Sequence, residues 1–315
     1  MENSRDNNVE NKPFMLTINC LAYNHEKYIR NTLESFVSQK TNFRYEAIVH
    51  DDASTDGTAN IIREYAELYP DIIKPIFEKE NLYSKCDGSL SRVMMEACRG
   101  KYVAYCEGDD YWTDPLKLQK QVDYMEAHPE VVYSCCRFHI LNELKGTYED
   151  GYNAYFDKTI HVNETEFLFD QSYPYKTDWI TLTLTQVIRR DAIETCYETM
   201  FKYYRDVHLI YYVLSKGQGV CHNFFGGVYR LSDTSTFGKF SNKERFKMNY
   251  SVYKEFYDKE RSKLLKYCLT KTIVKLMTMG EFVRPDKWYI ARLYPIAISR
   301  FLYRETKDFA KLILR

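Results

Sequence analysis

The fold is decided by the stretch Lys101-Tyr-Val-Ala-Tyr-Cys-Glu-Gly-Asp-Asp-Tyr-Trp112. Residues 102–106 are apolar and aromatic, which predicts a buried strand. Three carboxylates, those of Glu107, Asp109 and Asp110, follow the strand around a glycine. Like charges this close raise the pKa of at least one carboxyl unless a cation lies among them. The cluster is therefore either a Mg²⁺ or Mn²⁺ site that also takes the phosphates of a substrate, or a solvated turn before the next helix.

Upstream of this stretch the sequence alternates between strand and helix patterns. Apolar runs predict strands at 14–20, 45–50, 72–77 and 102–106, and helical periodicity predicts helices at 27–39, 59–69, 89–98 and 116–127. Strands that alternate with helices indicate an α/β fold with a mostly parallel, twisted sheet covered by helices on both faces. Ligands bind beyond the carboxyl ends of such strands. Both acidic clusters, at Asp51 and at Glu107, lie there.

The second half of the chain is less regular. A strand at 131–138 precedes a long polar segment at 142–175, and a connection of that length inside a compact domain usually serves a function. Alternation then predicts a strand at 179–188, helices at 191–200 and 206–215, and two short strands at 220–224 and 227–231. From residue 242 onward the pattern is that of amphipathic helices.

The second acidic cluster reads Asp51-Asp-Ala-Ser-Thr-Asp-Gly-Thr58. A carboxylate at a strand end can accept hydrogen bonds from a nucleobase or a ribose hydroxyl, and we expect Asp52 to make this contact. Ser54 and Asp56 are residue types that cap the following helix, so Asp56-Gly57 is interpreted as a turn and cap. Half of this motif is therefore structural.

Charge is unevenly distributed along the chain. The formal net charge is zero, but residues 238–315 hold 19 Lys and Arg against 8 Asp and Glu, a net charge of +11, which leaves −11 for residues 1–237. Nine cysteines, an odd number without a C-x-x-C pair, indicate neither a disulfide framework nor a zinc site, and favour reduced thiols in a cytosolic protein. Residues 1–12 are polar, which predicts a disordered segment rather than a signal peptide, and no apolar run approaches the roughly 18–20 residues of a membrane span.

Three motifs now carry a resemblance to a known family: Thr17-Ile-Asn-Cys-Leu-Ala-Tyr-Asn24, Ile48-Val-His-Asp-Asp-Ala-Ser-Thr-Asp-Gly-Thr58 and the stretch from Ala97 to Trp112. In this order and spacing the chain resembles the family 2 glycosyltransferases of the GT-A fold over residues 13–232. The resemblance implies an inverting transferase that uses a nucleotide-diphospho sugar, usually a UDP-sugar, and Mn²⁺ or Mg²⁺. The acceptor is then a glycan or a lipid-linked glycan, as in bacterial surface polysaccharide synthesis. We expect a transferase domain at 13–237 and a basic helical region at 238–315.

The resemblance also implies roles for single residues. The D-x-D element of the family corresponds to Glu107-Gly108-Asp109, which makes Asp109 and Glu107 the metal ligands, with Glu107 departing from the usual Asp. The catalytic base corresponds to Asp206, within Arg205-Asp-Val-His-Leu209, and a plain helix N-cap is the alternative for it. The expected nucleotide-binding residues are Ala22, Asn24, Asp52, Arg92, Glu107 and Arg230, and the expected acceptor-side residues are Asp110, Trp179 and Thr181.

Simple structural roles compete with several of these assignments. Arg230, in an element where Ser232 replaces the family's His, is alternatively a buried arginine paired with an acid. Arg92 is alternatively a solvated helix charge, and Trp179 a core side chain. Three histidines, His25, His50 and His139, have no ligand partner at metal spacing and are interpreted as structural.

The basic region mixes cations with aromatic and aliphatic residues, as interfacial helices do. It therefore predicts peripheral binding to an anionic membrane surface on the cytoplasmic side, with packing on the transferase domain or on a second copy of the chain as alternatives. No nucleic-acid motif accompanies the charge. Two other functions compete with transfer. A sugar nucleotidylyltransferase needs a glycine-rich loop after the first strand, and Leu21 to Glu26 contain no glycine, while a degenerate scaffold would not need Asp52, Asp109 and Asp206.

Overall fold

The chain forms two compact units in a computed structural model that describes residues 13–85, 88–151, 165–176, 181–194, 201–202, 204–232, 240–281, 292–293, 295–299 and 303. The first unit comprises Met1–Met200 and Asp206–Asp233, and the second comprises Phe201–Arg205 and Thr234–Arg315. The domain boundary expected at 237/238 stays a prediction. Each unit is described by itself.

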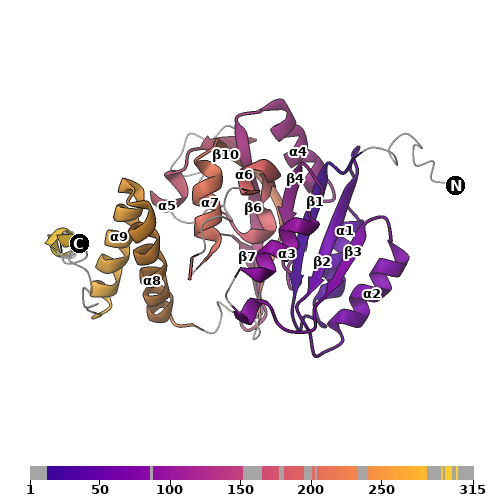
Figure 1. Cartoon of the computed structure of the whole chain (residues 1–315), viewed down its shortest axis with the longest axis horizontal. Helices are drawn as coiled ribbons and strands as arrows, with labels where there is room; N and C mark the ends of the chain where they lie inside the picture. Colours follow the sequence, from indigo (N-terminus) through magenta and orange to yellow (C-terminus); the bar gives the residue numbers. More distant parts are fainter. Residues whose placement is uncertain are drawn as a thin grey trace. The chain divides into compact units, whose positions relative to one another are not determined.

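The first half of the sheet in the first unit is parallel. Strand β1 (Leu16–Ala22) lies between β2 (Tyr45–Asp51) and β4 (Tyr102–Tyr105), and β3 (Ile73–Phe77) pairs with β2. Helices α1 (Ile29–Val37), α2 (Thr58–Leu68) and α3 (Ser89–Ala97) connect these strands, and α2 lies at the β3 end of the sheet (Figure 1). The predicted strand-helix alternation is thus confirmed. Because Ala22 pairs with Asp51 and Asn19 with Tyr105, the loops after β1, β2 and β4 leave the same edge of the sheet.

The second half of the sheet is mixed. The strand order is β3-β2-β1-β4-β9-β6-β10-β5, with β9 at Val187–Arg189, β6 at Val131–Asn142, β10 at Gln218–Leu231 and β5 at Tyr111–Trp112. Strand β10 is parallel to β6, whereas β9 and β5 are antiparallel to their neighbours. Two further strands, β7 (Thr147–Asp150) and β8 (Glu166–Phe169), add antiparallel pairs to β6 and β10. Both lie in the segment 142–175 that the sequence marked only as a long connection.

Other elements of this unit are α4 (Lys117–Ala127), the short helices α5 (Tyr173–Lys176) and α6 (Arg190–Glu194), α7 (Asp206–Leu214), and the single turns η1 (Tyr83–Lys85) and η3 (Thr183–Thr185). The main core is built from β1, β2 and α1. All seven residues of β2 are buried, and Ile29, Leu33 and Phe36 of α1 pack beneath the sheet. Strands covered on both faces carry apolar runs, such as Ala47-Ile-Val49 in β2, and these runs made the strands predictable even though Glu46, His50 and Asp51 are buried in the same strand.

Two strand predictions were wrong. The strand expected at 179–188 is instead η3 followed by β9, and residues 177–180 lie outside the described part. The hydroxyl of Thr185 donates to the carbonyl of Leu182 at 2.8 Å, a local bond that competes with strand pairing. The two strands expected at 220–224 and 227–231 are one strand, β10, with register shifts on both sides of Phe225. A Cβ at Gly227 would lie 2.8 Å from the carbonyl oxygen of Tyr111, so the glycine serves close strand approach rather than a turn.

Between residues 242 and 278 the second unit forms two helices, as the periodicity predicted. Helix α8 (Asn242–Glu260) begins at Ser241, whose hydroxyl accepts a hydrogen bond from the N–H of Glu244, and α9 is Lys263–Thr278. The buried faces of these helices pack through a cluster that includes Tyr250, Leu269, Ile273 and Leu276. Among the helices that the structure describes, none combines the length and the apolar character that crossing a bilayer requires.

Candidate active site

The acidic turn after β4 brings three carboxylates together. Ligand oxygens of Glu107, Asp109 and Asp110 all lie within 4.8 Å of one another. The turn is fixed by main-chain bonds, because the N–H of Gly108 donates to the carbonyl of Leu21 at 2.9 Å and the N–H of Asp110 to that of Glu107 at 3.1 Å. The site predicted at the carboxyl end of this strand is therefore a preformed cluster of oxygen donors.

Asp110 is the buried member of the cluster, with 1% of its surface exposed. Its Oδ1 accepts a hydrogen bond of 2.8 Å from the main-chain N–H of Arg230, on β10. The hydroxyl of Thr32, on α1, contacts the carbonyls of Asp110 at 2.6 Å and Gly108 at 3.0 Å. Asp110 is thus tied into the scaffold from two sides.

Arg230 supports the turn from behind. Its Nε donates to the carbonyl of Asp109 at 2.9 Å, and its guanidinium forms an ion pair with Glu143. The guanidinium carbon also lies 4.7 Å from the ring centroid of Tyr28, whose hydroxyl donates to Glu143 at 3.1 Å. Only 6% of Arg230 is exposed, so these contacts match its alternative role, that of a buried arginine paired with an acid. Its role toward a diphosphate stays a prediction.

The carboxylates of the turn repel one another, as their pKa values indicate. The pKa of Asp110 is raised well above its usual range by burial, then by the charges of Asp109 and Glu107. The pKa of Glu107 is raised to about 8 by the loss of surrounding water, then by the charges of Asp109 and Asp206. Glu107 is exposed at its surface, but repulsion from the neighbouring carboxylates raises its pKa even without burial. A divalent cation would relieve this repulsion, so the donor set fits Mn²⁺ or Mg²⁺.

Asp206 begins α7 and is exposed. Its Oδ1 accepts a hydrogen bond of 2.9 Å from the N–H of Val207, and its charge contributes to the raised pKa of Glu107. The charge of the expected base therefore acts on one of the expected metal ligands, although 99 residues separate Asp206 from Glu107 in sequence. Its catalytic role stays a prediction.

Asp52 is fully buried at the end of β2. Its two carboxylate oxygens accept hydrogen bonds from the N–H groups of Leu82 at 2.7 Å and Tyr83 at 3.0 Å. Asp52 thus ties β2 to the chain after β3, and its contact with a nucleotide stays a prediction. The neighbouring Asp51 is 3% exposed, and its Oδ1 has no hydrogen-bond partner within the described part of the chain. Sequence reasoning did not single out Asp51.

The loops after β1 and β2 are cross-tied. Asn24 has a φ of 56°, a conformation that Asn tolerates better than most residues. Its N–H donates to the hydroxyl of Ser54 at 2.9 Å, and its Oδ1 accepts from the N–H of Thr55 at 2.8 Å. The carbonyl of Ala22, the last residue of β1, accepts from the N–H of Asp52 at 2.9 Å. Ala22, Asn24 and Asp52, three of the expected nucleotide-binding residues, therefore lie in one connected unit.

Two other expected residues, Arg92 and Thr181, lie apart from these contacts. Arg92 is exposed on α3, which is what its alternative role as a solvated helix charge requires. Thr181 is fully buried, and its hydroxyl lies 2.7 Å from that of Tyr133 and 3.0 Å from that of Thr185. Trp179 lies outside the described residues. Roles for these residues toward nucleotide or acceptor stay predictions.

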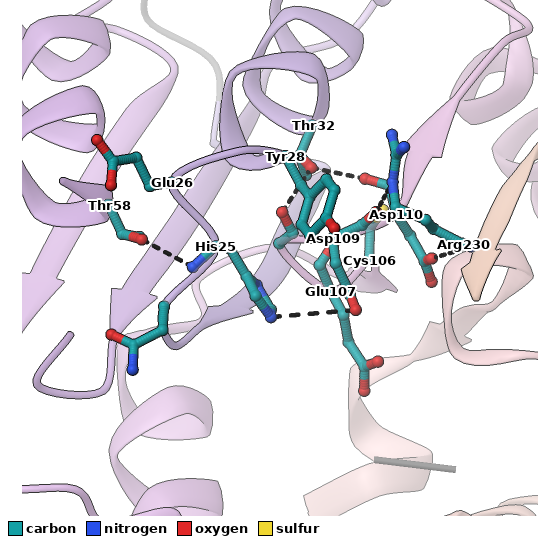
Figure 2. A network of polar contacts seen from close by, with 12 residues as sticks. His25, Glu26, Tyr28, Thr32, Thr58, Cys106, Glu107, Asp109, Asp110 and Arg230 are labelled. Carbon is teal, nitrogen blue, oxygen red and sulfur yellow. Dashed lines mark hydrogen bonds and ion pairs between the residues drawn. The ribbon is translucent and has the colours of Figure 1, made fainter. Parts of the chain in front are cut away.

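His25 is the site residue that sequence reasoning missed, because it was interpreted as structural. Its Nε2 lies 4.0 Å from Oδ2 of Asp109, and Figure 2 shows the ring directed toward the acidic turn. Burial lowers the pKa of His25, and Asp109 acts in the opposite direction. A signal was available, because His25 follows the first predicted strand, and ligands bind beyond the carboxyl ends of such strands.

Comparison with known proteins agrees with this geometry. The model of the family described as Glycosyl transferase family 2 matches residues 18–196, more than half of the chain. The uncharacterized protein Mb1547 of Mycobacterium bovis is 46% identical over 43% of this chain and 37% of its own length. WfaP of Escherichia coli, a UDP-Glc:alpha-D-GlcNAc-diphosphoundecaprenol beta-1,3-glucosyltransferase, is 32% identical over 40% of this chain and 47% of its own length. The matches thus span less than half the length of these relatives.

Solved structures show the same fold at low identity. TarS 1–349 of S. aureus in complex with UDP-GlcNAc has a TM-score of 0.59 at 15% identity, over 91% of this chain and 80% of that one. The mannosyltransferase PcManGT of Pyrobaculum calidifontis, in complex with GDP-Man and Mn²⁺, has a TM-score of 0.54 at 15% identity, over 96% of this chain and 84% of that one. These likenesses confirm the expected GT-A class of fold. With the family match and the acidic turn after β4, they lead to one assignment: the chain belongs to glycosyltransferase family 2.

Proposed function

We propose that the chain is an inverting glycosyltransferase that moves a sugar from a nucleotide-diphospho sugar, in our proposal a UDP-sugar, to a glycan or lipid-linked glycan of a bacterial surface polysaccharide. The observation that carries this proposal is the gathering of three carboxylates within 4.8 Å at the end of β4, with the charge of Asp206 acting on one of them. The UDP-GlcNAc bound by TarS and the lipid-linked acceptor in the name of WfaP support the substrate classes.

In this proposal Asp206 is the general base. The acceptor hydroxyl attacks the anomeric carbon opposite the diphosphate, and Asp206 takes its proton as the new carbon–oxygen bond forms. The bond between the anomeric carbon and the diphosphate oxygen breaks, and its electron pair leaves with the diphosphate. Glu107, Asp109 and Asp110 would hold Mn²⁺ or Mg²⁺, and the bound cation would supply positive charge against the departing phosphates. Asp52 and Asn24 orient the nucleoside.

Thermal unfolding with nucleoside diphosphates tests the donor site. A ligand that binds only the native state at about 100 times its Kd stabilises it by about 2.7 kcal/mol. We expect the melting temperature to rise with UDP plus Mn²⁺, and Asp109→Asn to abolish the rise. Release of UDP from a panel of UDP-sugars then identifies the donor. If no nucleoside diphosphate raises the melting temperature, the degenerate scaffold is the better description.

The second unit has a separate role in the proposal, which is binding to an anionic membrane surface. Residues 238–315 carry a net charge of +11, and Phe240, Ile296, Ile298 and Tyr303 are exposed. Cations beside exposed apolar side chains suit an anionic lipid surface. We expect the protein to sediment with phosphatidylglycerol vesicles, less so at high salt, and not with phosphatidylcholine vesicles. Dimerisation without lipid binding at low salt would favour a second copy of the chain as the partner.

A further inference from the structure

His25 reaches the acidic turn from a different part of the sequence. The residue lies in the loop after β1, and its Nε2 is 4.0 Å from Oδ2 of Asp109 (Figure 2). At this distance the two groups are not hydrogen-bonded, and a hydrogen bond between them requires the Asp109 carboxylate to move toward the ring. The imidazole therefore faces one oxygen of the expected metal ligand.

The position of His25 is fixed by its backbone. Its N–H donates to the hydroxyl of Thr58 at 2.8 Å, and its carbonyl accepts from the N–H groups of Tyr28 and Ile29, both at 2.8 Å. The ring also packs against Gly108, because a Cβ there would lie 2.8 Å from Nδ1. A side chain at position 108 would displace the imidazole, which gives the glycine between Glu107 and Asp109 a structural reason.

The surroundings of Nδ1 determine which nitrogen carries hydrogen. Nδ1 is buried and has no hydrogen-bond partner among the described residues. A buried N–H without an acceptor is costly, so the hydrogen belongs on Nε2, which faces the Asp109 carboxylate. Carboxylates that ligate metals are commonly held by such a neighbouring donor, which orients the ligand oxygen.

We propose that His25 is a positioning residue for Asp109. Its Nε2–H holds Oδ2, so that Oδ1 of the same carboxylate is directed to the divalent cation. His25 touches neither substrate nor metal in this arrangement and acts through Asp109. The inference rests on the proposed function, because it takes Asp109 as a metal ligand.

Mn²⁺ binding in the presence of UDP tests the inference without any turnover, by electron paramagnetic resonance of the free ion. His25→Gln keeps an N–H near the Nε2 position, and His25→Leu removes it. We expect His25→Leu to weaken Mn²⁺ binding by about 10- to 100-fold and His25→Gln to stay within about threefold of the parent. His128→Leu, which replaces a partly exposed histidine at the end of α4, is the matched control. Equal losses in both His25 variants, or none in either, overturn the inference.

A measurement on the unsubstituted protein keeps the inference testable if a variant does not fold. Nitrogen-15 NMR of histidine, with UDP and diamagnetic Mg²⁺, reports which ring nitrogen of His25 carries hydrogen. We expect Nε2–H, and an Nδ1–H tautomer overturns the inference. A nitrogen coupling from His25 to bound Mn²⁺ in pulsed resonance also overturns it, because His25 would then be a ligand. If Mn²⁺ does not bind at all with UDP, the metal site of the proposed function fails as well. If Mn²⁺ binds with UDP and His25→Leu binds it as tightly as the parent, only the inference about His25 fails and the proposed metal site stands.

Discussion

The main-chain N–H of Arg230 donates a hydrogen bond of 2.8 Å to Oδ1 of Asp110, across a sequence separation of 120 residues. This bond joins the end of β10 to the acidic turn after β4. Any residue other than proline at position 230 keeps this donor, because the donor is the backbone N–H. Substitutions of Arg230 therefore test the guanidinium alone.

Arg230→Lys keeps the charge but loses the forked geometry that reaches Asp109 and Glu143 together. We expect a loss of about 2 kcal/mol in the free energy of unfolding, measured by urea titration, and weaker binding of UDP with Mn²⁺. If Arg230 acts by supporting the turn, Glu143→Gln should lower both the free energy of unfolding and the affinity for UDP with Mn²⁺. A fall in UDP affinity for Arg230→Lys alone would instead favour direct contact with the diphosphate.

The pKa of Glu107, raised to about 8, predicts how stability depends on pH without metal. The folded chain holds this proton above the usual glutamate pKa near 4.5, at which the unfolded chain releases it. Between about pH 4.5 and 8 the folded state thus binds more protons, and its stability falls as pH rises. We expect Glu107→Gln to flatten part of this slope in chelator-treated protein, followed by urea unfolding. Glu149→Gln, an exposed position on β7, should leave the slope unchanged.

Asp52 has a structural task whatever else it does. Asp52→Ala leaves the N–H groups of Leu82 and Tyr83 without their acceptor, which we expect to cost about 2 kcal/mol in the free energy of unfolding. Asp71→Ala, at an exposed position after α2, should cost much less. Asp52→Asn separates the two roles. If Asp52→Asn is as stable as the parent but binds UDP more than tenfold more weakly, measured by calorimetry, the nucleotide contact is supported. If stability and UDP affinity fall together, the contact is not supported.

Asp206→Asn tests the base while preserving the start of α7, since the amide oxygen still accepts the N–H of Val207. We expect kcat to fall by about 10²- to 10⁴-fold with little change in UDP binding or melting temperature. Asp191→Asn, in the first turn of α6, is the control. A folded Asp206→Asn protein that keeps substantial turnover eliminates this residue as the base.

Much of the fold and part of the site could be predicted because their signals are local. Strand β2 is buried along its whole length around the apolar run Ala47-Ile-Val49, and the acidic clusters stand at the end of β2 and directly after β4. The acid that pairs with Arg230 behind the turn could not be predicted, because Glu143 is 87 residues away and nothing local in either segment indicates the other. The threonines near 181–185 misled for a related reason: they alternate as a strand does, yet Thr185 bonds to its own turn.

The bonds between the loops after β1 and β2 have a consequence for how variants combine. Asn24 bonds to Ser54 and Thr55, and the N–H groups of His25 and Glu26 donate to Thr58 and Asp56. Residues that share one hydrogen-bond network show interaction energies in double-mutant cycles, typically of about 0.5–3 kcal/mol. Losses from Asn24→Ala and Ser54→Ala should therefore not sum. The two loops therefore contribute to the stability of the protein as one unit. Once one substitution has disrupted their hydrogen bonds, a second substitution in the same network should lower the free energy of unfolding by little more.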